Sequence, residues 1–134
     1  MDNKIRLDIV TPYGLVMSDD VDEITAAGSE GEFGVLPGHV PFITTLRIGM
    51  LLVKKDNKTD IIFVNSGYAE VTSEKTVILA DSAERAEDID VERAKAAMKR
   101  AEERLAQAEK IDFARATAAL ERATIRIQVA EKRR

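Results

Sequence analysis

The sequence predicts an α+β protein, with an N-terminal antiparallel β-sandwich over residues 1–86 and a C-terminal two-helix hairpin over residues 87–134. Near residue 88 the hydrophobic period changes from two to about three and a half residues, and glycine and proline disappear from there onward. Residues 1–87 hold 8 Lys+Arg and 15 Asp+Glu, a net −7, whereas residues 88–134 hold 12 and 9, a net +3. These three changes at one point indicate two segments with different roles.

The first half is a series of short strands separated by polar turns. Ile5, Leu7 and Ile9 alternate with Arg6 and Asp8, a pattern typical of a half-buried strand. Further strands are expected at residues 15–17, 21–27, 51–55, 61–66, 68–72 and 75–80. Many short strands without an intervening helix favour a sandwich or barrel, and the 4% aromatic content predicts an aliphatic core.

One stretch, residues 31–46 (GEFGVLPGHVPFITTL), combines turn residues with many apolar side chains. Its three glycines and two prolines predict irregular backbone. Loops are usually polar, so apolar side chains here suggest a contact surface. His39 is the only histidine of the chain, which leaves it without a second histidine or a cysteine for a metal site or a catalytic triad.

The second half predicts two helices with heptad-spaced apolar residues. The first stripe is Val91, Ala94, Met98, Ala101, Leu105 and Ala108, and the second is Phe113, Ala116, Leu120, Ala123, Ile127 and Ala130. We expect a turn near residues 108–111, with Asp112 as the N-cap of the second helix. Because each alanine buries little area, we expect a weak seam and a mobile appendage.

The motif I-D-x-x-R-A opens each predicted helix, at residues 89–94 and 111–116. Aspartate is a good N-cap, but an arginine in the first turn opposes the helix macrodipole. Rows of arginines follow on the two helices, namely Arg93 and Arg100 on the first and Arg115, Arg122 and Arg126 on the second. Two interpretations remain open: a solvated face balanced by neighbouring glutamates, or a binding site for phosphate or for an acidic helix.

Several classes of protein are disfavoured. The chain has no cysteine, no apolar run of about 20 residues and no glycine-rich phosphate-binding motif. It offers no nucleophile–base pair and no metal cluster, so we assign no catalytic residue and no metal site. A nucleic-acid-binding module is favoured only by the basic tail, and a generic β-sandwich adaptor with a helical hairpin remains an alternative.

Three segments resemble one family: GSEGEFGVLPGHVPF, NSGYAEV, and VILADSAERAEDIDVERA followed by an alanine-rich hairpin. The chain resembles the epsilon subunit family of the bacterial rotary proton-translocating ATP synthase over essentially its whole length. The resemblance implies a ten-stranded β-sandwich followed by two helices. It also implies a non-catalytic subunit of the central rotor stalk, which couples the catalytic hexamer to the membrane.

The resemblance further implies partners and a location. The sandwich would bind the gamma subunit and the c-subunit ring, and the extended helical tail would reach the beta and alpha subunits and inhibit ATP hydrolysis. The protein would lie peripherally at the cytoplasmic face of the bacterial membrane, without direct insertion and without nucleic acid. Residues that match the c-ring or gamma interface are Glu30, Glu32, Phe33, Val35, Leu36, His39, Val40 and Phe42.

Some family members bind ATP on the folded hairpin as a regulatory ligand, with no metal of the protein's own. Residues that match their ATP-binding positions are Glu84, Asp90, Arg93, Ala94, Arg100, Arg122 and Arg126. Ala94 would let the nucleotide approach closely, and the arginines would hold its phosphates. Glu92 and Glu121 depart from the pattern by placing acid next to these arginines.

Overall fold

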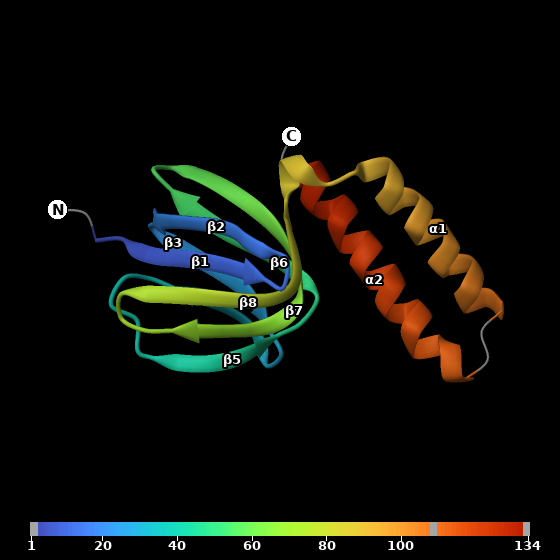
Figure 1. Cartoon of the computed structure of the whole chain (residues 1–134), viewed down its shortest axis with the longest axis horizontal. Helices are drawn as coiled ribbons and strands as arrows, with labels where there is room; N and C mark the ends of the chain where they lie inside the picture. The colour runs from blue at the N-terminus through green and yellow to red at the C-terminus, as the bar shows by residue number, and fades with distance from the viewer. Residues whose placement is uncertain (1–2, 108–109, 133–134) are drawn as a thin grey trace.

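The computed structural model describes residues 3–107 and 110–132, and it confirms a β-sandwich followed by two helices (Figure 1). The elements are β1 (Ile5–Thr11), β2 (Gly14–Val21), β3 (Glu23–Gly28), β4 (Gly31–Val35), β5 (Phe42–Leu46), β6 (Gly49–Lys55), β7 (Lys58–Val71), β8 (Lys75–Arg85), the 3₁₀ helix η1 (Ala86–Asp88), α1 (Val91–Gln107) and α2 (Lys110–Lys132).

The strands pair in the order β2-β1-β8-β7-β5-β3-β4, and β6 pairs with β3 and β7. All of these pairs are antiparallel except β1 with β8, which are parallel. The prediction of a purely antiparallel sandwich is therefore wrong at this one pair. The alternation of apolar residues fixes which face of a strand is buried, but it does not fix which distant strand lies beside it or in which direction.

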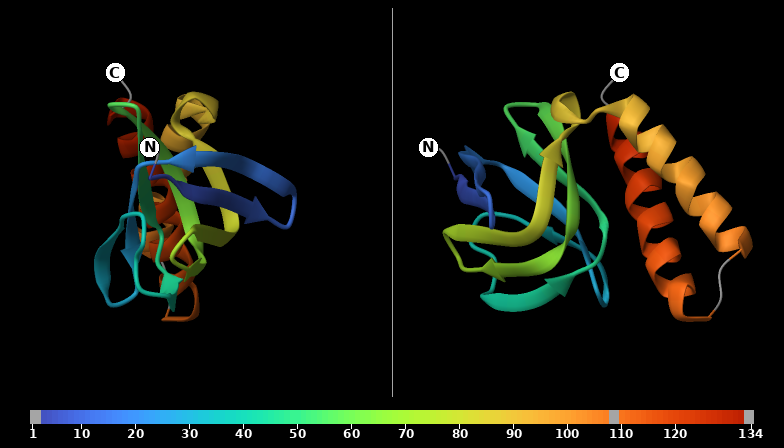
Figure 2. Two further views of the ribbon diagram at one scale, coloured as in Figure 1. Left: turned by 90° about the vertical axis from the view of Figure 1, so that its left-hand side faces the viewer. Right: turned by 45° about the vertical axis from the view of Figure 1, so that its right-hand side comes forward.

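The long strands β7 and β8 bend and take part in both layers of the sandwich (Figure 2). The first half of β7 pairs with β6, and its second half pairs with β5. Between the halves, Ser66 and Gly67 have φ of 46° and 141°, and the register with β8 skips one residue on each strand. The resemblance implies ten strands, whereas the structure describes eight. The long strands β7 and β8 each count as one continuous strand although each takes part in both layers.

The main core is aliphatic, as the composition predicts. Ile5, Leu7 and Ile9 of β1 are almost completely buried, together with Val35 of β4 and Ile78 of β8. The prediction of irregular backbone over residues 31–46 is wrong at both ends, because β4 and β5 occupy residues 31–35 and 42–46. Phe33 and Val35 alternate with exposed residues along β4, so their burial follows the strand period.

The predicted start of the first helix is confirmed in detail. Asp90 precedes α1, and its carboxylate accepts a hydrogen bond from the backbone N–H of Arg93 at 3.0 Å, the geometry of an N-cap. The N-cap predicted for the second helix is wrong. Helix α2 begins at Lys110, so Asp112 lies within its first turn and does not precede it. The expected turn falls partly on residues 108–109, which lie outside the described residues.

The two helices pack through small residues, and α2 lies between the sandwich and α1 (Figures 1 and 2). Ala94 and Ala101 of α1 and Ala116 and Ala123 of α2 are buried, as the heptad pattern predicts. A second apolar cluster joins the end of α2 to the sandwich. This docking cluster has a buried centre of Phe63, Ala86, Ile89 and Val129, with Ile48, Met50, Ile61, Ile125 and Ala130 packed against it.

Candidate functional site

A pocket of about 330 Å³ lies where β8, α1 and α2 meet, and we call it the helix–sandwich pocket. Its lining residues are Glu84, Asp88, Asp90, Arg93, Ala94, Ala97, Arg100 and Arg126. The volume is within the range of small-molecule sites. Strand β8 supplies Glu84, the segment before α1 supplies two aspartates, and each helix supplies arginine.

Arg126 connects α2 to the sandwich at this pocket. Its Nε donates a hydrogen bond to Oε1 of Glu84 at 3.1 Å, and its guanidinium carbon lies 4.4 Å from the ring centre of Phe63. Phe63 and Glu84 are register partners on β7 and β8, so their side chains emerge side by side. Arg126 therefore makes an ion pair and a cation–π contact with two neighbouring side chains of the sandwich.

The start of α1 provides the opposite side of the pocket. Arg93 and Arg100 lie seven residues apart on one face of α1, and both side chains are exposed. Ala94 is 4% exposed, and its methyl side chain lets a ligand approach the helix closely. The site thus offers cationic donors for a phosphate and carboxylate acceptors for amino or hydroxyl groups.

The sequence-derived residues for ATP binding converge on this pocket with one exception. Arg122 does not line it; this residue lies one helical turn before Arg126 on α2, about 6 Å along the axis. Two lining residues, Asp88 and Ala97, were missed by the sequence reasoning. Ala97 lies one turn after Ala94, and helical spacing from the I-D-x-x-R-A motif could have identified it.

The connection between β4 and β5 forms an exposed apolar surface. Leu36 is 57% exposed and Val40 is 74% exposed, while Phe33 and Phe42 are partly buried and pack edge to face with ring centres 5.2 Å apart. Glu30 and Glu32 lie exposed at the β3–β4 turn. The prediction that Val35 belongs to the partner interface is wrong, because its side chain is completely buried in the main core.

His39 is held by its immediate neighbours. Its Nδ1 lies 2.6 Å from the carbonyl oxygen of Val40, and its ring lies 5.1 Å from the ring of Phe42. Because the carbonyl can only accept, Nδ1 is the donor and Nε2 is left for an external contact. This arrangement presents a polar nitrogen within an apolar surface.

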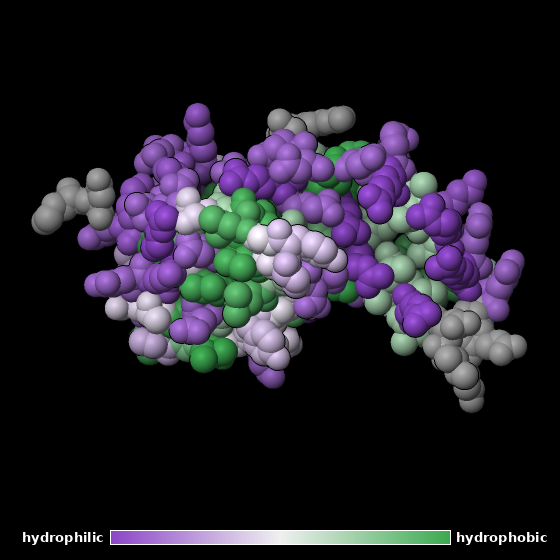
Figure 3. All heavy atoms as spheres, viewed as in Figure 1, coloured by the Kyte–Doolittle hydropathy of each residue, from purple (hydrophilic) through white to green (hydrophobic). Residues whose placement is uncertain are grey.

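A row of exposed apolar residues crosses the outer face of the sheet formed by β2, β1, β8, β7 and β5. Tyr68 is opposite Leu79, Leu79 is opposite Val10, and Val10 is opposite Leu15 in register. We call these residues, with Ile43 on β5, the outer apolar row. Tyr68, Leu79, Leu15 and Ile43 are between 49% and 71% exposed. Figure 3 shows hydrophobic side chains gathered on this face of the sandwich.

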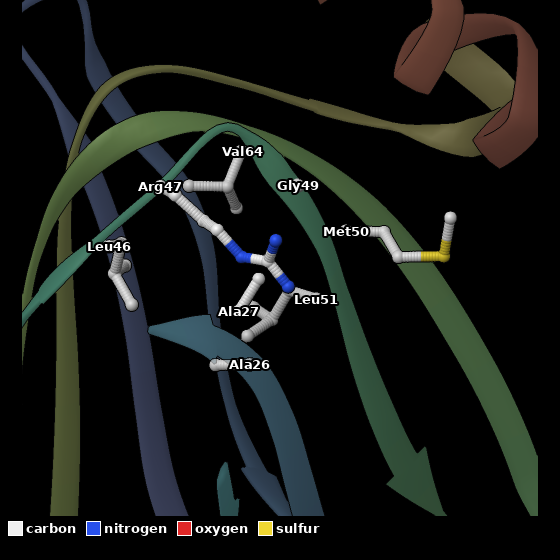
Figure 4. Close-up of a pocket in the computed structure, with 8 residues that line it drawn as sticks. All are labelled: Ala26, Ala27, Leu46, Arg47, Gly49, Met50, Leu51 and Val64. Atoms are coloured by element: carbon white, nitrogen blue, oxygen red, sulfur yellow. The ribbon is translucent and has the colours of Figure 1, made fainter. Parts of the chain in front are cut away.

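A second, smaller pocket lies among β3, β6 and β7 (Figure 4). It is lined by Ala26, Ala27, Leu46, Arg47, Gly49, Met50, Leu51 and Val64. Its volume of about 10 Å³ has room for roughly one water molecule. This pocket is too small to be a ligand site.

Two searches within residues 3–107 and 110–132 gave no candidate. No helix in this part of the chain is long and apolar enough to cross a bilayer. No group of three or more histidine, cysteine or carboxylate side chains there has the arrangement needed to hold a metal ion.

Two family models match the chain in succession. The model described as "ATP synthase, Delta/Epsilon chain, beta-sandwich domain" matches residues 4–86. The model described as "ATP synthase, Delta/Epsilon chain, long alpha-helix domain" matches residues 87–131.

Two similar proteins carry the same name. An "ATP synthase epsilon chain" from Thermodesulfovibrio yellowstonii is 57% identical over 105 residues, which cover 78% of this chain and 75% of the relative. A protein of the same name from Nitratidesulfovibrio vulgaris is 55% identical over 107 residues, which cover 80% of each chain.

Two similar solved structures come from parts of mitochondrial ATP synthases. A chain in the structure of the Euglena gracilis mitochondrial ATP synthase, described as OSCP/F1/c-ring, matches with a TM-score of 0.82 and 25% identity, covering 99% of this chain and 82% of that one. A chain in the Tetrahymena thermophila mitochondrial ATP synthase, described as central stalk/c-ring, matches with a TM-score of 0.57 and 18% identity, covering 97% and 96%. That second match supports the fold alone.

Proposed function

This chain belongs to the delta/epsilon family of ATP synthase chains, and from that membership we propose that it is a rotor subunit that couples the catalytic hexamer to the c ring. It is a non-catalytic subunit of the complex. The observation that carries the proposal is the match of 99% of the chain to a protein in an OSCP/F1/c-ring assembly. Proton translocation itself then belongs to the membrane sector.

The surface between β4 and β5 is our candidate for the contact with the c ring. Leu36 and Val40 offer exposed apolar area, and His39, Glu30 and Glu32 supply polar groups around it. An apolar patch with a polar rim is typical of a protein interface. Through this contact the protein would lie peripherally at the cytoplasmic face of the membrane, without inserting into it.

The outer apolar row is our candidate for the contact with the gamma subunit. It extends across the outer sheet face from β5 to β2, on a different face from the docked helices. Its members alternate along each strand with residues of the main core and therefore point away from it. These side chains are not needed to fill the core and are available to a partner.

The test of the rotor role is assembly. The chain should co-purify with gamma and the c oligomer, and Val40→Asp should weaken capture of the c oligomer because it places a charge in an apolar contact. Thr59→Asp, which adds the same charge at an exposed position of β7, is the matched control. Failure of the wild-type chain to join gamma and the c oligomer would remove the proposal.

We further propose ATP as a regulatory ligand of the helix–sandwich pocket. ATP would contact β8, α1 and α2 at once, and it would therefore favour the closed arrangement over any arrangement in which the helices leave the sandwich. Arg93 and Arg100 would hold phosphates. Titration calorimetry tests this: wild type should give heat at millimolar ATP, and Arg126→Ala should bind more weakly.

The released helices would act as an inhibitor of ATP hydrolysis. In an extended arrangement, Arg100, Arg104, Arg115 and Arg122 would meet acidic segments of the beta subunits and neighbouring alpha subunits. The attachment of the helical pair through the end of α2 supports such a release, because only the docking cluster and the neighbouring contacts of Arg126 have to separate.

A further inference from the structure

Glu84 and Arg126 form an ion pair inside the helix–sandwich pocket, to which we assign ATP. This ion pair bears on how ATP binding at the pocket is regulated. The two side chains are 33% and 26% exposed, so the pair is partly shielded from water. Phe63, completely buried in the docking cluster, supports the guanidinium from below. Arg126 is therefore bound to the sandwich by contacts within the protein itself.

The other arginines of the pocket differ from Arg126. Arg93 and Arg100 form no ion pair with any residue in the described part of the chain. Both are exposed at the rim on α1, whereas Arg126 comes from α2. Of the three arginines that line the pocket, only Arg126 thus has a carboxylate partner among the described residues.

A carboxylate and a phosphate compete for such an arginine. Both are anions that accept hydrogen bonds from guanidinium N–H groups, and like charges in one partly shielded pocket repel each other. A polyphosphate that approaches Arg126 therefore meets a cation whose charge is already balanced by Glu84.

We propose that Glu84 is an internal substitute for the nucleotide phosphate, which keeps the helical pair docked when no nucleotide is bound. This inference rests on the proposed ATP site. When ATP binds, its phosphate replaces the Glu84 carboxylate at Arg126. The closed arrangement of the helices therefore does not require ATP. Bound ATP would release the Glu84 carboxylate to accept a hydrogen bond from the ligand.

The consequence is a regulation that differs from simple ligand-induced closure. Without nucleotide, Glu84 lowers the population of released helices by about fivefold, as expected for a partly exposed ion pair. The same pair lowers the apparent affinity for ATP by a comparable factor, because ATP has to displace it.

The test uses the full chain and the variant Glu84→Gln, which keeps the shape of the side chain and removes its charge. Glu87→Gln is the matched control, since Glu87 is exposed on η1 and does not line the pocket. Hydrogen exchange of the backbone amides in the second half of α2 reports docking, and calorimetry reports ATP binding.

We expect exchange in nucleotide-free Glu84→Gln to be about fivefold faster than in wild type and in Glu87→Gln, since the lost interaction is of that size. Saturating ATP should remove the difference, and Glu84→Gln should bind ATP more tightly than wild type. Equal exchange in all three proteins, or weaker ATP binding by Glu84→Gln, would overturn the inference. Faster exchange in Glu84→Gln with no ATP binding by any variant would instead overturn the ATP site and the competition.

Discussion

Among the residues that the structure describes, Thr76 is a buried polar residue whose side chain lacks a hydrogen-bond partner. It is completely buried on β8, opposite Leu7 of β1 and Val71 of β7, and its Oγ1 has no hydrogen-bond partner among the described residues. A buried unsatisfied hydroxyl costs roughly 1–3 kcal/mol. The β-branched shape fits the core, while the hydroxyl group opposes stability.

We expect Thr76→Val to raise the free energy of unfolding by about 1 kcal/mol, because valine has nearly the same shape and removes the unsatisfied group. Urea denaturation near neutral pH measures this change. Thr59→Val, at an exposed position of β7, is the control and should change stability little. A less stable Thr76→Val protein would show that the hydroxyl is satisfied after all.

Three aspartates at the β1–β2–β6 side of the sandwich carry lowered pKa values. The hydrogen bond from Ser18, followed by that from Lys75, lowers the pKa of Asp8. Lys55 lowers the pKa of Asp19, and Lys4 lowers that of Asp22. Each carboxylate is therefore more easily protonated in the unfolded chain than in the folded one.

The sign of the pH dependence follows from these directions. The stabilisation by the three carboxylates is present above their unfolded pKa, about 3.9, and is lost as the pH falls through the lower folded values. We expect Asp22→Asn to reduce the loss of stability between about pH 4 and pH 2. Thermal denaturation across this range is the measurement, with Asp60→Asn as the control because Asp60 is exposed and forms no ion pair within residues 3–107 and 110–132. Identical pH profiles for Asp22→Asn and wild type would contradict the assignment.

At the scale of elements, α2 has two apolar faces with different tasks. One face packs on α1 through Ala116 and Ala123, and the other docks on the sandwich through Ile125 and Val129. The single stripe predicted from heptad spacing describes the first face and reaches the docking cluster only through Ala130. The second face explains how a seam rich in alanine is nevertheless attached to the rest of the molecule.

Val129→Asp should release α2 from the sandwich. Val129 is completely buried in the docking cluster, and its apolar burial alone contributes about 1.5–3 kcal/mol before the added cost of burying a carboxylate. The main core contains no α2 residue, so the sandwich should remain folded. Hydrogen exchange should show loss of protection in α2 with retained protection in β1 and β8.

The control for this experiment is Gln128→Asp, which introduces the same charge at the neighbouring exposed position. It should leave the protection of α2 close to the wild-type level. Cooperative loss of protection in helix and sandwich together for Val129→Asp would show that the two parts form one inseparable unit.

The sequence predicted the features that depend on local chemistry. Asp90 caps α1 because capping needs only a side chain and an N–H three residues later, and the motif carries both. The pocket residues around Arg93 and Ala94 were found because a local motif resembled a family pattern. The buried alanines followed from helical periodicity.

The features that were missed depend on distant contacts. The parallel pair of β1 and β8 joins the first and the last strand of the sandwich in sequence, and no local sequence pattern encodes this pairing. At Gly67, a Cβ would lie 1.9 Å from the carbonyl oxygen of Leu79, so the requirement for glycine appears only once β7 and β8 are paired. The glycines and prolines around Val35 predicted irregular backbone and obscured a strand whose side chains reach the core.

At the scale of the whole molecule, the sandwich and the helical pair are joined at two neighbouring places. The docking cluster supplies apolar contact, and the helix–sandwich pocket beside it supplies charged contact through Arg126, which stacks on Phe63 of the cluster. Any ligand of the pocket therefore acts on the same attachment that has to open for the helices to extend. The fold thus combines a β-sandwich with a helical pair to which we assign the regulatory role proposed above.

The most direct test is the rate of ATP hydrolysis by the assembled complex with three forms of this subunit. Deletion of residues 88–134 should leave assembly intact and raise hydrolysis, because it removes the helices that we propose to be inhibitory. Val129→Asp should lower hydrolysis below the wild-type rate, because it releases the helices without removing them. Equal rates with the truncated and the full-length subunit would contradict the account.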